Sequence, residues 1–168
     1  MSYANRGKTL EKMIEMTNNI YRERGIATVQ KIPTPVKVLN VGRNGKLTGF
    51  YEKKSTVDYI GVWKGQAICF DAKETKVETR FDLSNVKDHQ YQYMKSWHEN
   101  EGIAFLIVMF STLNEAYFLS FKELKYWKDE SERESIPYDE FQFIIEESSV
   151  PVDYAGILKL FEDEKEVD

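Results

Sequence analysis

Residues 57–73 read VDYIGVWKGQAICFDAK, two β-rich runs on either side of the pair Lys64-Gly65. We interpret this pair as a two-residue hairpin turn; a four-residue loop closing at Val62 and Ala67 would keep the same register, whereas a three-residue loop would break it. In that register Asp58 lies directly opposite Asp71. The stretch therefore predicts a hairpin that brings two acidic side chains together.

The same register sets Thr56 opposite Lys73, and side-chain alternation puts both on the face of the two acids. Like charges opposed in a half-buried sheet are destabilising. A divalent cation resolves the repulsion, and hard oxygen ligands suit Mg²⁺, with Mn²⁺ as a substitute. Such a site favours phosphodiester hydrolysis, with the lysine stabilising the transition state. The alternative is a strand end where both acids point to water.

Two further side chains are candidates for this site. Gln90 lies on the apolar stripe of a helix predicted over residues 86–101, so it is either a hydrogen-bonded core glutamine or a carbonyl ligand of the metal. Glu11 lies near the start of a helix predicted over residues 8–24. It either approaches the site from the other side or is an ordinary exposed acid.

The remaining pattern predicts an α/β fold, with a mixed β-sheet flanked by helices and a projecting β-hairpin. We expect one domain over residues 1–168, with the hairpin at residues 36–53. Its turn is predicted at Asn44-Gly45, which would set Val41 opposite Thr48 and Leu39 opposite Phe50. The other predicted segments are strands at 26–32, 103–109, 116–119 and 141–145, and helices at 121–127 and 154–161.

Composition narrows the class of protein. The 42% hydrophobic and 14% aromatic content excludes global disorder. One cysteine and two histidines exclude a disulfide framework and a zinc cluster built on Cys and His. The sequence has no apolar run long enough to span a bilayer and no signal-peptide core at its start. We therefore expect a cytoplasmic protein with no membrane partner.

Charge is distributed unevenly along the chain. The net charge of −5 and the pI near 5.2 argue against nucleic-acid binding. However, residues 1–80 hold 15 Lys and Arg against 8 Asp and Glu, whereas residues 81–168 hold 8 against 20. This asymmetry indicates either a polyanion-binding half or a solvated face with an acidic tail. The candidate phosphate contacts are Arg6, Lys37, Arg43, Lys46, Lys53, Lys54, Lys76 and Arg80.

Asp58 followed by Asp71-Ala72-Lys73 matches the PD-(D/E)xK pattern of restriction-endonuclease-like nucleases. The surrounding motifs are more specific, and from residue 5 to 161 the chain resembles the RecU family of Holliday junction resolvases, found in Gram-positive bacteria and their phages. The motifs are NRG (5–7), PTPV (33–36), STVDY (55–59), GVWKG (61–65), DAKETK (71–76), AYFL (116–119) and PVDY (151–154), with His89, Gln90 and Met94.

The resemblance implies a Mg²⁺ site made by Thr56, Asp58, Asp71 and Gln90, with Lys73 as the transition-state stabiliser. The family usually has Glu where this chain has Asp71, so the carboxylate is retracted by one methylene. The hairpin at residues 36–53 would be the family's stalk, which projects into the junction centre.

The resemblance also implies a homodimeric endodeoxyribonuclease that makes paired symmetric nicks in four-way DNA junctions during recombination and repair. It would work in a bacterial or phage-infected cell, with recombination proteins as further partners. Two alternatives are a related nuclease that acts on another DNA structure and a junction-binding protein that has lost catalysis.

Overall fold

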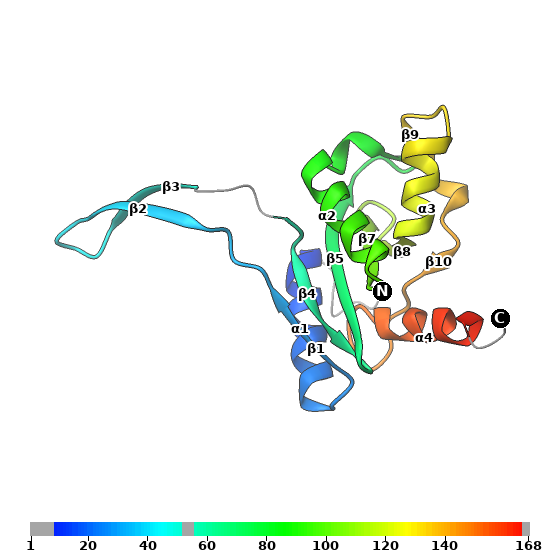
Figure 1. The fold of residues 1–168 in the computed structure, drawn as a ribbon, viewed down its shortest axis with the longest axis horizontal. Helices are drawn as coiled ribbons and strands as arrows, with labels where there is room; N and C mark the ends of the chain where they lie inside the picture. Colours follow the sequence, from blue (N-terminus) through cyan, green and yellow to red (C-terminus); the bar gives the residue numbers. More distant parts are fainter. Residues whose placement is uncertain (1–8, 52–55, 166–168) are drawn as a thin grey trace.

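The computed structural model describes residues 9–51 and 56–165, and its centre is a six-stranded mixed sheet (Figure 1). Strands β5 and β7 are parallel, and the other neighbouring strands are antiparallel. The strand order is β1 (Ala27–Lys31), β4 (Tyr59–Trp63), β5 (Gln66–Thr75), β7 (Ile103–Phe110), β8 (Glu115–Ser120) and β10 (Phe143–Ile144). The predicted fold class, a mixed sheet flanked by helices, is confirmed.

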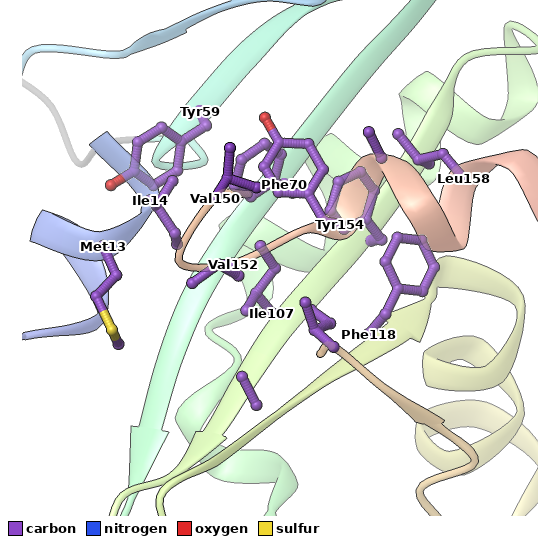
Figure 2. Close-up of a cluster of buried hydrophobic side chains, with 14 of the residues drawn as sticks. Met13, Ile14, Tyr59, Phe70, Ile107, Phe118, Val150, Val152, Tyr154 and Leu158 are labelled. Atoms are coloured by element: carbon purple, nitrogen blue, oxygen red, sulfur yellow. The ribbon is translucent and has the colours of Figure 1, made fainter. Parts of the chain in front are cut away.

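Helices cover both faces of this sheet. One hydrophobic cluster joins α1 (Leu10–Glu23) and α4 (Tyr154–Lys165) to one face, as Figure 2 shows in close-up. The rings of Tyr59, Phe70, Phe105 and Phe118 stack across four neighbouring strands in this cluster, with centroids 4.4–4.8 Å apart. A second cluster joins α2 (Asp88–Glu99) and α3 (Phe121–Lys125) to the other face.

Local signals explain the ends of α1. The Thr9 hydroxyl accepts the Lys12 N–H as an N-cap, and Gly25 follows the helix at φ 66°, a conformation that glycine adopts without strain. The helix therefore lies within the predicted range 8–24. No described helix has both the length and the apolar character needed to cross a membrane.

Short elements complete the described chain and were not predicted. Strands β6 (Arg80–Asp82) and β9 (Ser135–Pro137) form a separate pair, next to the 3₁₀ turns Leu83–Asn85 and Tyr138–Glu140. The helix predicted over 121–127 stays α-helical only to Lys125, and Tyr126–Glu130 follows as a π-helical turn. Elements of three residues are too short to show a periodic pattern in the sequence.

Strands β2 (Val36–Val41) and β3 (Leu47–Tyr51) form a two-stranded hairpin that projects from the body (Figure 1). Its predicted register was wrong: Val41 pairs with Leu47, and Phe50 pairs with Lys37. Gly45 takes a positive φ of 76°, but Asn44 does not. The loop therefore has three residues, with the Gly42 N–H bonded to the Lys46 carbonyl, and an irregularity near Leu39 shifts the pairing again.

A polar contact joins α1 to the start of α4. The Tyr21 hydroxyl donates to Asp153 Oδ1 at 2.6 Å and accepts the Ala155 N–H at 3.1 Å. Burial and Asp153 raise the pKa of Tyr21, so its hydroxyl stays protonated. Because Tyr21→Phe would leave a buried N–H without an acceptor, we expect it to lower the free energy of unfolding by about 1–3 kcal/mol. Urea denaturation measures this, and an effect no larger than that of Tyr126→Phe, at an exposed ring, would contradict it.

Candidate active site

The second hairpin forms in the predicted register. Lys64 and Gly65 take φ values of 45° and 79°, as a two-residue turn requires. The β4–β5 ladder runs from Trp63–Gln66 to Tyr59–Phe70, one position short of the two acids. The two-residue turn therefore sets the register that brings the two acids opposite each other.

Beyond the ladder, two side-chain hydrogen bonds hold the strands together. The Asp58 N–H donates to Asp71 Oδ1 at 3.0 Å, and the Ala72 N–H donates to Asp58 Oδ2 at 3.1 Å. Each acid thus accepts from the opposite strand, where backbone ladder bonds would otherwise form. The predicted meeting of Asp58 and Asp71 is confirmed.

Asp71 is fully buried, because β5 continues beside β7 and pairs Asp71 with Leu106. Burial raises the pKa of Asp71 to about 7, the Asp58 carboxyl raises it as well, and Lys73 partly offsets both effects. The buried Oδ2 atom lies 2.5 Å from Lys73 Nζ, in an ion pair that lacks hydrogen-bond geometry. One ammonium therefore compensates this pair of acids only in part.

Gln90 reaches the site through Lys73. Its Oε1 atom accepts from Lys73 Nζ at 3.0 Å and from the N–H of Lys87, the residue before α2, at 3.2 Å. Helix α2 packs on the sheet face toward which Cys69 and, by alternation, Asp71 and Lys73 point. The amide oxygen thus helps to hold the ammonium beside Asp71.

The structure places Thr56 and Glu11 near the acids without joining them to the pair. Thr56 is half-buried two residues before Asp58, and no hydrogen bond links its side chain to another described residue. The Glu11 carboxylate is exposed and lies 2.8 Å from Lys31 Nζ. The roles assigned to both residues remain predictions.

The candidate phosphate contacts divide into separate groups. Lys37, Arg43 and Lys46 are exposed on the projecting hairpin. Lys76 is exposed just after β5, and Arg80 is paired with Asp82 at 2.9 Å. Arg6, Lys53 and Lys54 lie outside the described residues.

The oxygen-rich donor set fits a divalent cation. Two carboxylates meet, one of them carries a buried oxygen without a hydrogen-bond donor, and an amide oxygen is close by. In residues 9–51 and 56–165 no group of three or more His, Cys, Asp or Glu side chains is placed to hold a metal. A cation here would therefore need neutral oxygen ligands or water beside the two acids.

Two charged residues near this site were missed from the sequence. Lys31 Nζ lies 2.8 Å and 3.9 Å from the carboxylates of Glu11 and Glu15. Glu74 accepts the Leu10 N–H at 2.9 Å. Glu74 directly follows Lys73, and this position was the only hint in the sequence of a role near the site. Its partner, Leu10, lies 64 positions away along the chain.

The family model for recombination protein U, RecU, matches residues 5–162. The chain belongs to the RecU family. Among relatives named Holliday junction resolvase RecU, that of Geobacillus kaustophilus is 43% identical over 148 residues, which are 83% of this chain and 74% of the relative. The Staphylococcus carnosus RecU is 42% identical over 134 residues, which are 76% of this chain and 64% of the relative.

The RecU of Staphylococcus aureus strain JH9 is 39% identical over 150 residues, which are 84% of this chain and 72% of that relative. This chain thus spans 64% to 74% of the length of these three relatives. Hjc of Archaeoglobus fulgidus, a Holliday junction resolvase of known structure, aligns with a TM-score of 0.43 and 9% identity, covering 86% of this chain and 98% of Hjc.

Proposed function

We propose that this RecU-family chain is a Holliday junction resolvase, a metal-dependent endonuclease that makes paired symmetric nicks in four-way DNA junctions. The observation that carries the proposal is the meeting of Asp58 with the buried Asp71, beside Lys73. The relatives' name, Holliday junction resolvase RecU, gives the substrate class.

In this proposal Asp58 and Asp71 hold Mg²⁺, with Mn²⁺ as a substitute and with Thr56 and Gln90 as further oxygen donors. When bound, the cation supplies Lewis-acid activation of the phosphate and of the attacking water. Burial raises the pKa of Asp71, and Lys73 offsets this effect only in part. A bound divalent cation would supply the positive charge that the ionised carboxylate still lacks. Glu11 is proposed as a further catalytic acid, which acts while its Oε2 atom stays beside Lys31 Nζ.

Lys73 is proposed to stabilise the transition state. Asp71 and Gln90 hold its ammonium from two sides, at 2.5 and 3.0 Å, so its position is fixed before DNA arrives. A donor held in advance aims at developing negative charge without a reorganisation cost. Only 17% of this side chain is exposed, which strengthens the effect.

The hairpin of β2 and β3 is the proposed stalk of a single nuclease domain over residues 1–168. We propose a homodimer, with one active site for each strand that is cut. An isolated two-stranded hairpin is marginal in water, so a function in binding explains why the chain keeps one. Its exposed cations suit the phosphates at the centre of a junction.

The test of this function is incubation with a synthetic mobile four-way junction and with linear duplex of matched sequence, each with and without Mg²⁺. We expect paired symmetric nicks in the junction, only with the cation. Equal cutting of linear duplex would favour a nuclease for another DNA structure. Junction binding without cleavage under any divalent cation would favour a protein that has lost catalysis.

The hairpin tip has its own prediction. Arg43→Glu combined with Lys46→Glu should weaken junction binding by about 10-fold or more and duplex binding less, because both charges lie at the proposed junction centre. Mobility-shift titrations of both DNAs at one salt concentration measure the ratio. Lys122→Glu with Lys125→Glu, two exposed charges on α3, is the matched control. An unchanged junction-to-duplex ratio for the tip variant refutes the role of the stalk at the junction centre.

A further inference from the structure

The start of α1 is tied to two strands of the sheet, β5 and β1. On one side, the Leu10 N–H donates to Glu74 Oε1 on β5 at 2.9 Å. On the other, Glu11 Oε2 lies 2.8 Å from Nζ of Lys31 on β1. Two consecutive helix residues thus bridge strands that lie on either side of β4.

These ties complete a closed ring of contacts. After Lys31, the Ile32 N–H donates to the Asp58 carbonyl at 2.8 Å. The Asp58 N–H then donates to Asp71 Oδ1, which returns the path to the strand that carries Glu74. We call this path, from β5 through α1, β1 and β4 back to β5, the bracing ring.

The bracing ring lies beyond the end of the backbone ladder between β4 and β5. Backbone pairing of β4 with β5 ends at Tyr59–Phe70, and beyond it two carboxylate-to-amide bonds join the strands. Glu74 cannot join the acids directly, since strand alternation turns it to the α1 face while Asp71 faces α2. Its partner, Leu10 N–H, is one of the helix-start donors that have no intrahelical acceptor.

Resting on the proposed function, we propose that Glu74 is a positioning residue for this active site: its bond to α1 closes the bracing ring and fixes the two acids relative to each other. The residue acts through the helix and does not ligate the cation. The carboxylate also favours the helix start electrostatically, which reinforces the bond.

Amide hydrogen exchange on the protein without metal or DNA tests this directly. The amides of Asp58 and Ala72 donate the two bonds between the acids, so they report on the site itself. Glu74→Ala should speed their exchange by about 10-fold, the effect of losing one net hydrogen bond. Glu74→Gln keeps an oxygen acceptor and should stay within about 2-fold of the parent.

Thr9→Ala is the matched control, because it removes the other side-chain cap of α1 and leaves the tie to β5. Unchanged exchange in Glu74→Ala overturns the proposal. Equal acceleration of exchange in Thr9→Ala also overturns the proposal, because the effect would then come from helix capping. The proposal is overturned as well if Glu74→Gln accelerates exchange as much as Glu74→Ala does.

A comparison of kcat with junction Kd gives a second test. With junction and Mg²⁺, Glu74→Ala should lower kcat by about 10-fold and leave junction Kd within about 2-fold, since misplaced catalytic groups slow chemistry. A change in Kd alone would overturn the positioning role. Because exchange needs neither DNA nor cation, its result stands even if the parent fails to cut junctions, which would count against the proposed function alone.

Discussion

Replacing Asp71 by asparagine is expected to reduce junction cleavage by on the order of 10³-fold or more. In the metal-free protein, the same change is expected to raise the free energy of unfolding relative to the parent as pH rises. Cleavage is lost because an amide carries no charge to hold the cation. The fold should survive, since the asparagine oxygen can still accept the Asp58 N–H. Junction binding without metal should remain within a few-fold of the parent.

The pH dependence follows from the burial of Asp71. Its pKa is raised from 3.8 to about 7, so the folded state holds a proton that the unfolded chain releases at lower pH. Its contribution to stability is therefore fully present below pH 4 and is lost as pH rises through about 7. Asparagine does not titrate, so its stability relative to the parent should rise by on the order of 2 kcal/mol between pH 5 and pH 8.

Urea denaturation without divalent cations, at pH 5 and pH 8, measures the change. Asp139→Asn, which makes the same change at an exposed acid, is the matched control. If the difference in free energy of unfolding between Asp71→Asn and the parent is the same at both pH values, Lys73 already compensates the buried carboxylate in full, which contradicts the expected rise. Cleavage close to the parent rate would remove Asp71 from the active site.

Replacing Lys73 by methionine is expected to slow cleavage by about 10²-fold or more, with junction binding nearly unchanged. The reason is the loss of a donor held in place by Asp71 and Gln90, an effect of the size seen when one preorganised transition-state donor is removed. Methionine keeps the length of the stem, so packing changes little.

The same variant should raise the pKa of Asp71 further, because Lys73 is the cation that lowers it. Carbon-13 NMR of the Asp71 carboxyl follows that titration in the metal-free protein. Lys122→Met, at an exposed position on α3, should change neither the rate nor the titration. A fall or no change in the Asp71 pKa would contradict the ion pair, and an unchanged cleavage rate would contradict the catalytic role.

The sequence predicted the centre of the site because its determinants are local. Lys64-Gly65 sets the turn, the turn sets the register, and the register brings Asp58 to Asp71. The same reasoning failed for the other hairpin, where Asn44 does not take the positive φ that a two-residue turn needs. Turn residues favour a loop type, but here the chain forms a three-residue loop, and an irregularity near Leu39 shifts the pairing again.

What the sequence could not provide are contacts between distant segments. The burial of Asp71 depends on parallel pairing with β7, and the Glu74 bond to α1 joins residues 64 positions apart. Gln90 was recognised as an unusual polar residue on an apolar stripe, but only the packing of α2 against β5 reveals that its oxygen meets Lys73. Periodicity identifies elements and not the partners that they meet.

If Asp58 and Asp71 together hold a divalent cation, an anomalous difference map from crystals soaked in Mn²⁺ will locate it. We expect a peak that both carboxylates contact, and no peak in Asp71→Asn crystals under the same soak. A peak elsewhere, or no peak in parent crystals at a Mn²⁺ concentration that supports junction cleavage, would show that the two acids do not hold the cation.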